Sequence, residues 1–289
     1  MDLLRYDFMI RALLGALVIG LVAPTLGIYL VQRRLSLIGD GIGHVALTGV
    51  GVGLLLDRSP VVTAVIVSVL GAVGVELLRQ RGRTSGDLAL TVLFYGGIAG
   101  GVVLVGLSDS TSANLAQYLF GSLTTTSRTD LVVIGILGGI VFAAMTALRP
   151  ALFAVSHDEE YARVSGLPVR TLNLILAGTT AVTVTIAMRT VGLLLISALM
   201  VVPVVGAQQV SRGFTGTLAL AVLIGVVAAG AGVAISGSID TAPGATIVIL
   251  TIGVFLALAG GAALWRARRP ARVTPRVDAE PPDMKIVVP

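Results

Sequence analysis

Nine apolar runs, each about long enough to cross a bilayer, constrain this chain more than any other feature of its sequence. An α-helix rises about 1.5 Å per residue, so roughly 20 apolar residues span a hydrocarbon core about 30 Å thick. With 55% hydrophobic and only 12% charged residues, the chain is too apolar for an ordinary soluble domain. We therefore predict an all-α, polytopic helix bundle with about eight or nine transmembrane helices. The runs are Ile10–Leu30, Leu37–Leu56, Pro60–Leu78, Leu88–Leu107, Leu131–Leu148, Leu172–Met188, Val191–Gln208, Leu218–Ile235 and Thr246–Leu264.

Basic residues cluster in alternate connections between these runs. They occur within residues 33–34, 79–83, 149–170, 212 and 266–276. Because cytoplasmic loops are enriched in Lys and Arg, the pattern predicts that these connections face the cytoplasm. With nine spans, the N-terminus would lie outside and the C-terminus inside. We expect residues 1–265 to form one membrane domain and residues 266–289, which combine proline, arginine and acidic residues, to form a disordered cytoplasmic tail.

Glycine and proline add two expectations about helix packing. Several glycine pairs are separated by three residues, a spacing that lets helix backbones approach each other. Pro203 lies inside the seventh run, where its missing N–H group should break the helix and free a carbonyl group. The glycine pairs are Gly39 and Gly43, Gly49 and Gly53, Gly97 and Gly101, and Gly135 and Gly139.

The sequence lacks residues that several other protein classes require. It has no cysteine, which excludes disulfides, thiolate metal ligands and iron–sulfur clusters. It also lacks the Gly-x-x-x-x-Gly-Lys-Ser/Thr phosphate loop and the His-Glu-x-x-His zinc motif. The net charge of +5 arises from the loops and the tail, without a patch of interleaved aromatic and basic residues. We therefore expect no enzyme activity, no ATP site, no permanently bound cofactor and no nucleic-acid partner.

The ionisable residues inside the second run are the strongest candidates for a functional site. Asp40 and His44 are four residues apart, so their side chains share one face of a helix. A charged group inside a bilayer costs at least about 2.5 kcal/mol on insertion scales, which makes such residues functional candidates. A carboxylate and an imidazole offer half of a coordination shell for Zn²⁺, Mn²⁺ or Fe²⁺, and a symmetric dimer would bring two such pairs together. Binding requires a neutral imidazole, so it should weaken as the pH falls.

A purely structural role would also explain this pair. Asp40 would then cap the second helix at its cytoplasmic end, and His44 would bond a neighbouring backbone carbonyl. The spacing alone leaves both interpretations open.

A polar stretch between two runs, residues 157–166, is the second candidate site. Its Glu-x-Ala-x-x-x-Gly pattern, formed by Glu160, Ala162 and Gly166, predicts a short helix that ends at glycine. A short amphipathic helix outside the membrane would suit the docking of a soluble partner. A solvated loop with ordinary helix caps would explain the same pattern, and His157 is interpreted as a surface residue.

These motifs together resemble the permease subunits of zinc, manganese and iron ABC importers. The most specific segment is Arg33–Gly49, and the resemblance extends from Tyr6 to about Leu264. It implies a homodimer in the cytoplasmic membrane of a prokaryote, with ABC ATPase subunits on the cytoplasmic side and a metal-binding protein outside. The supporting segments are Thr84–Asp87, Tyr118–Ser122, Asp158–Gly166, Val191–Leu199 with Pro203, and Asp240–Gly244.

The resemblance also assigns roles to the candidate residues. Asp40 and His44 would be metal ligands in the transport pathway, and the divalent ion would be cargo. ATP would be used by the partner subunit, whose closure would drive alternating access. The loop that couples the permease to the ATPase would contain Asp158, Glu159, Glu160, Ala162 and Gly166.

Two other functions remain open at this point. A permease for a metal chelate, such as a siderophore or cobalamin, needs no ligands inside the membrane, so replacing His44 should leave its transport intact. A secondary carrier would transport without any ATPase. One aspartate and one histidine suit zinc, manganese and iron alike, so the sequence does not choose the metal.

Overall fold

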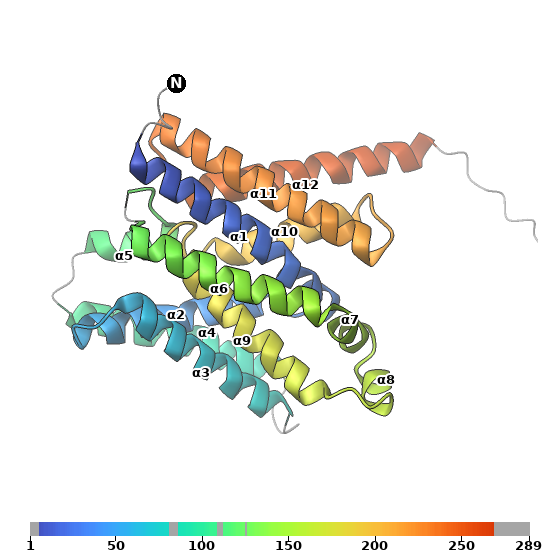
Figure 1. Cartoon of the computed structure of the whole chain (residues 1–289), viewed down its shortest axis with the longest axis horizontal. Coiled ribbons are helices and arrows are strands. Elements are labelled where there is room, and N and C mark those ends of the chain that lie inside the picture. The colour runs from blue at the N-terminus through green and yellow to red at the C-terminus, as the bar shows by residue number, and fades with distance from the viewer. Residues whose placement is uncertain (1–5, 81–85, 109–111, 125, 269–289) are drawn as a thin grey trace, which may run out of the picture.

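A bundle of membrane-length helices forms the fold (Figure 1). The computed structural model describes residues 6–80, 86–108, 112–124 and 126–268, and the regular structure in these residues is entirely helical. Eight of the described helices are long and apolar enough to cross a membrane, which confirms the predicted polytopic bundle. The helices are α1 (Asp7–Gln32), α2 (Ile38–Leu55), α3 (Pro60–Gln80), α4 (Gly86–Leu107), α5 (Ser112–Phe120), α6 (Arg128–Ala147), α7 (Arg149–His157), α8 (Glu159–Val164), α9 (Val169–Ala187), α10 (Ile196–Gln208), α11 (Phe214–Ile239) and α12 (Pro243–Arg268).

Each predicted run coincides with one helix, but the seventh helix is shorter than its run. α10 has 13 residues and begins at Ile196 rather than at Val191. At about 1.5 Å per residue it is about 20 Å long, which is too short to cross a bilayer alone. Pro203 lies inside α10, so the predicted break at this proline is wrong.

The interruption of the seventh run lies before α10 instead. α9 ends at Ala187, and Gly192 in the turn that follows has a φ angle of 92°, a left-handed conformation that favours glycine. The N–H groups of Leu193 and Leu194 then donate to the carbonyls of Tyr118 and Leu119, at 3.0 and 3.2 Å. This pairing satisfies backbone groups that would otherwise need a continuous helix.

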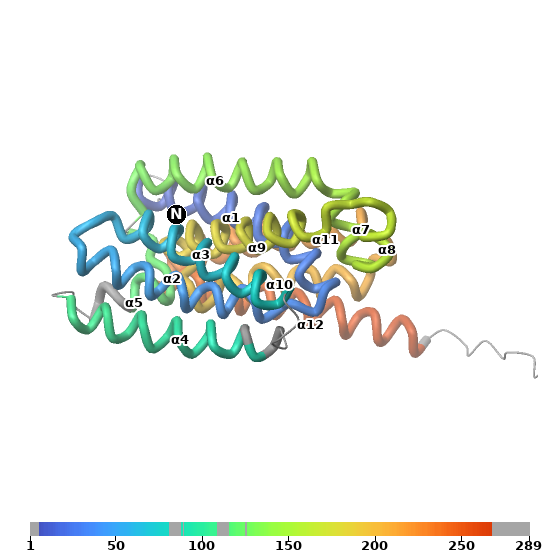
Figure 2. Tube along the Cα trace, turned by 90° about the horizontal axis from the view of Figure 1, so that it is seen from below, coloured from blue at the N-terminus to red at the C-terminus, as the bar shows by residue number. Residues whose placement is uncertain are grey.

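The two ends of the bundle differ in what they contain. Figures 1 and 2 place α7, α8 and the C-terminal end of α12 at one end, and α5 and the start of α1 at the other. The arginine-rich connections that the sequence predicts to face the cytoplasm lie at the first end. α12 continues to Arg268, past the predicted domain boundary at residue 265. The predicted disordered tail beyond it lies outside the described residues.

Glycine allows α2 to pack closely against both of its neighbours. A Cβ atom at Gly97 of α4 would lie 2.6 Å from backbone atoms of His44 and Val45, and one at Gly49 would lie 2.5 Å from the Cα of Ala64 in α3. The predicted close contacts are confirmed at these positions. The prediction for Gly135 and Gly139 is wrong, because a Cβ there would meet no atom of the described chain within 4 Å.

Alanine substitutions at two of these glycines should separate packing from helix propensity. Gly97→Ala forces α4 away from α2, and overpacking of this kind costs about 1–3 kcal/mol. Gly135→Ala adds a methyl group to open space and improves helix propensity, so it should be neutral or slightly stabilising. Thermal unfolding of the two purified variants in the same detergent measures the difference. Equal midpoints for both variants would contradict the close α2–α4 contact.

Candidate functional site

The turn between α1 and α2 determines where the candidate ligands lie. Arg33 caps the C-terminus of α1, and Arg34 has a left-handed φ angle of 58° that redirects the chain. α2 then begins with Leu37 as its N-cap residue, without a side-chain capping bond. Asp40 lies in the first turn, where its charge interacts favourably with the helix dipole. The interpretation of Asp40 as the helix cap is therefore wrong.

Asp40 and His44 lie on a partly accessible face of α2. Thr48 continues this face one turn further and donates a hydrogen bond to the carbonyl of Gly97, at 2.8 Å. The imidazole of His44 packs edge-on against Phe94 of α4, with ring centroids 4.3 Å apart. It does not bond a backbone carbonyl, as the structural interpretation required. Neither Asp40 nor His44 forms a hydrogen bond or an ion pair with a described residue.

One chain supplies only part of a metal coordination shell here. Within the described residues, no group of three or more His, Cys, Asp or Glu side chains comes together. A transition metal takes four to six ligands, so Asp40 and His44 provide at most half of a site. A further oxygen lies nearby: the Ser197 hydroxyl is buried without a described partner, 2.7 Å from where a Cβ on Gly39 would be. The start of α2 is thus polar on two sides.

The stretch between α6 and α9 forms the short helices α7 and α8. The Oδ1 atom of Asp158 caps α8 by accepting from the backbone N–H of Tyr161, at 2.9 Å. Gly166 has a φ angle of 82°, and the N–H groups of Gly166 and Leu167 donate to carbonyls of the last turn, both at 3.1 Å. These two bonds form a Schellman motif, which confirms the predicted helix end at glycine.

α8 has a buried face and an exposed face. Ala162 is fully buried, so it holds α8 against the bundle and does not itself face a partner. Tyr161 and Val164 are 68% and 88% exposed, and Glu160 is exposed beside them. No role for Tyr161 or Val164 was predicted from the sequence. The sequence did contain a signal: residues three apart lie on the same side of a helix, so this pair forms a second apolar face in addition to the one that contains Ala162.

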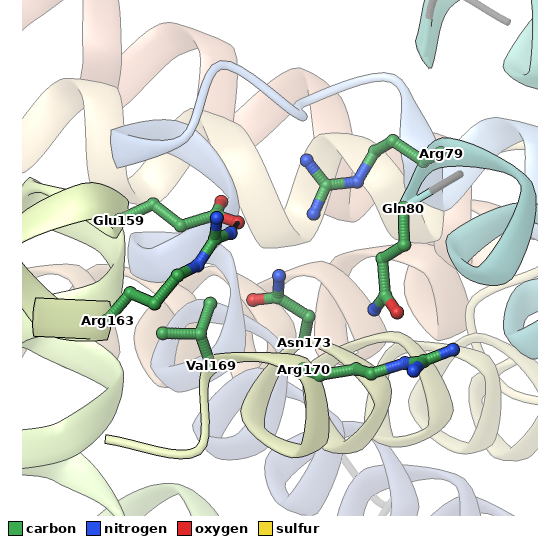
Figure 3. A pocket seen from close by; sticks show the side chains of 7 residues that line it. All are labelled: Arg79, Gln80, Glu159, Arg163, Val169, Arg170 and Asn173. Carbon is green, nitrogen blue, oxygen red and sulfur yellow. Dashed lines mark hydrogen bonds and ion pairs between the residues drawn. The ribbon is translucent and has the colours of Figure 1, made fainter. Parts of the chain in front are cut away.

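A buried ion-pair network joins α8 to the turn before α2. The Arg33 side chain is 8% exposed and donates to Glu159 at 2.8 Å and to Asn173 of α9 at 2.7 Å. Arg163 donates to the same carboxylate at 3.4 Å. Figure 3 shows these two side chains next to each other. Burial and the nearby charge of Arg79 lower the pKa of Arg33, and Glu159 partly offsets this effect. Glu159, predicted to be a coupling residue, thus links α8 to the bundle.

A comparison with known proteins identifies the family of this chain. The model of the ABC 3 transport family matches residues 5–260. The chain belongs to the ABC 3 transport family. Membership makes it a multi-pass membrane subunit of an ABC transporter, and the resemblance inferred from Arg33–Gly49 and the other motifs is confirmed.

Two related transport proteins and one solved structure align with nearly the whole of this ABC 3 chain. The high-affinity zinc uptake system membrane protein ZnuB of Haemophilus influenzae is 30% identical over 87% of this chain and 96% of its own length. The manganese transport system membrane protein MntC of Halalkalibacterium halodurans is 31% identical over 88% of this chain and 87% of its own. The structure of PsaBC from Streptococcus pneumoniae in complex with Fab matches with a TM-score of 0.80 at 27% identity, covering 93% of this chain and 98% of that one.

Proposed function

We propose that this ABC 3 protein is the permease subunit of an importer for a divalent transition metal ion: zinc, manganese or iron. The observation that carries the proposal is the pair Asp40 and His44, which lies in a membrane-spanning helix without a hydrogen-bonding partner among the described residues. Asp40 lies in the first turn of this span, and a bound cation would offset the cost of keeping an unpaired carboxylate there. Relatives named for zinc and manganese transport support this class of cargo.

Two copies of the chain would complete the coordination shell. Each copy contributes one carboxylate and one imidazole, so a symmetric pair offers four donors around a shared axis. Oxygen and nitrogen ligands of this kind suit Zn²⁺, Mn²⁺ and Fe²⁺. A site divided between two subunits also changes when the subunits move, which allows the metal to bind in one arrangement and to leave in another.

The energy for this movement would come from a separate ATPase that docks on α8. The sequence has no phosphate loop of its own. The exposed Tyr161 and Val164 would contact the ATPase, while Glu159 and Arg33 would transmit its movement to the turn before α2. ATP binding would then exchange outward and inward openings of the pathway. A metal-binding protein would deliver the ion at the opposite end of the bundle, where α5 lies.

Uptake by the assembled complex tests this function. The permease, its ATPase and its binding protein are reconstituted in proteoliposomes and supplied with radiolabelled zinc, manganese or iron. We expect ATP-dependent uptake of at least one free ion, and no uptake when the ATPase is omitted. Uptake without ATPase would identify a secondary carrier. Uptake of a siderophore or cobalamin complex in place of every free ion would identify a chelate permease, and either result overturns the proposal.

A further inference from the structure

The imidazole of His44 needs a fixed orientation to bind a metal well, and no hydrogen bond provides one. Most histidine ligands donate from their second ring nitrogen to a carboxylate or a carbonyl, and that bond sets the tautomer and the direction of the ring. Asp40 and His44 form no hydrogen bond with each other or with another residue that the structure describes. Side-chain packing is the remaining means of orienting this ring.

Phe94 of α4 makes the packing contact with the imidazole. The centroids of the Phe94 and His44 rings are 4.3 Å apart, and the ring planes are 77° apart. Aromatic pairs in this edge-to-face arrangement usually have centroids about 4.5–7 Å apart, so the contact is a close one. Any large rotation of the imidazole would displace the phenyl ring or lose the contact. Tyr95 packs edge-on against Phe94, with centroids 5.5 Å apart, which limits the movement of the phenyl ring.

The backbone contact between α2 and α4 places Phe94 at this position. Gly97 brings α4 close to α2 beside His44, because a Cβ atom there would lie 2.6 Å from the carbonyl carbon of His44. The Thr48 hydroxyl donates to the carbonyl of Gly97 at 2.8 Å, which fixes the two helices along their length. Phe94 precedes Gly97 by three residues, so both lie on the same face of α4. The helix contact thus holds the phenyl ring against the imidazole.

Apolar packing alone does not require a ring at residue 94. Leu90 and Leu93 pack against the same helix near Gly41, where a Cβ atom would lie 2.8 and 3.3 Å from their methyl carbons. Leucine therefore suits the α2–α4 contact one turn away. A phenyl ring differs from leucine in being flat and rigid, and such a side chain restricts a neighbouring ring to few orientations. Replacing Phe94 by leucine therefore separates the orientation of His44 from the filling of space.

We propose that Phe94 is a positioning residue that orients the imidazole of His44 for metal binding. This inference rests on the proposed function, in which His44 is a metal ligand. Without the phenyl ring the imidazole remains in place but is free to rotate, and metal binding would then have to immobilise it at a cost in affinity. Changes to residues that orient metal ligands lower affinity about 10- to 100-fold. We expect an effect of about tenfold, because Phe94 acts through packing instead of a hydrogen bond.

Nuclear magnetic resonance of the two histidines tests the contact itself. The sequence has only two histidines, so the full-length chain with isotope-labelled histidine in lipid nanodiscs gives two sets of ring signals. The ring current of Phe94 displaces the signals of the His44 ring protons. Phe94→Leu should remove this displacement, and Phe94→Tyr, which keeps the ring, should retain it. The signals of His157, which stacks on Phe153 of α7, should stay unchanged and report that the fold is intact.

Calorimetric titration of the same samples with Zn²⁺ and with Mn²⁺ tests the role in metal binding. We expect Phe94→Leu to weaken the affinity about tenfold and Phe94→Tyr to restore it to nearly that of the wild type. Phe142→Leu is the matched control. Phe142 is a partly buried phenylalanine of α6, and Figure 2 shows α4 and α6 on opposite sides of the bundle. This substitution should change neither the His44 signals nor the affinity.

The two measurements distinguish failure of this inference from failure of the proposed function. A change in the His44 signals without a loss of affinity, or the reverse, overturns the role of Phe94 and leaves His44 as a ligand. Equal losses of affinity in Phe94→Leu and Phe94→Tyr, or in Phe94→Leu and Phe142→Leu, show a general effect of substitution and also overturn it. If the wild type binds neither ion, or His44→Ala binds as tightly as the wild type, the metal site itself is wrong.

Discussion

Replacement of His44 by alanine is expected to lower ATP-dependent metal uptake by at least about 100-fold while the permease still assembles with its ATPase. In a symmetric pair, one substitution removes two of the four proposed donors. Changes to residues that merely orient a metal ligand cost about 10- to 100-fold in affinity, so loss of the ligands themselves should cost at least as much. His44 is only partly buried and bonds no described residue, so its removal should not unfold the chain. Initial rates of radiolabelled uptake in proteoliposomes measure the effect.

The other histidine of the sequence provides the matched control for this experiment. His157 is exposed at the end of α7 and stacks on Phe153, with ring centroids 5.9 Å apart. His157→Ala therefore removes an imidazole outside the proposed pathway, and uptake should stay within about twofold of the wild type, since exposed substitutions change stability little. Asp40→Asn should resemble His44→Ala, because an amide keeps the shape of the carboxylate without its charge. Full uptake by His44→Ala would show that His44 is not a metal ligand in the pathway.

The positions of the helices could be predicted from the sequence because lipid imposes a simple rule. Every backbone polar group in the hydrocarbon must be bonded within its own helix or to other protein groups, so a run of apolar residues reports a helix directly. α10 departs from the prediction because the backbone N–H groups of Leu193 and Leu194 donate to a distant segment, Tyr118–Leu119. Hydropathy cannot reveal that pairing. Gly135 and Gly139 mislead for a related reason, since glycine spacing does not tell which side of α6 has a neighbour.

The candidate site could be predicted only in part from the sequence. The four-residue spacing places Asp40 and His44 on one face, and the structure keeps them there. The role of Arg33 was not accessible, because its partners Glu159 and Asn173 are more than a hundred residues away in the sequence. The positive-inside rule already explains an arginine at the end of a span. The sequence therefore gave no reason to expect that Arg33 is buried and has a structural role. The exposure of Tyr161 and Val164 likewise depends on how α8 packs, and composition does not report it.

Replacement of Val164 by aspartate is expected to weaken association with the ATPase by at least tenfold and to abolish ATP-driven uptake. Val164 is 88% exposed, so a carboxylate at this position remains hydrated in the free permease and should change stability by no more than about 0.5 kcal/mol. In the proposed complex the same carboxylate would be desolvated against the ATPase without a partner. A penalty of about 1.4 kcal/mol is already a tenfold loss of affinity. Co-purification at increasing ATPase concentration measures the association.

A second exposed valine separates docking from a general effect of added charge. Val210 is 53% exposed and lies just before Phe214 of α11, which packs on Phe153 of α7, so it belongs to the same end of the bundle but not to α8. Val210→Asp adds the same charge there and should leave ATPase association within about twofold of the wild type. If both variants weaken association equally, the ATPase responds to charge over the whole surface. If neither does, α8 is not the docking element, and the Glu159–Arg33 pair then stabilises the fold without transmitting movement to α2.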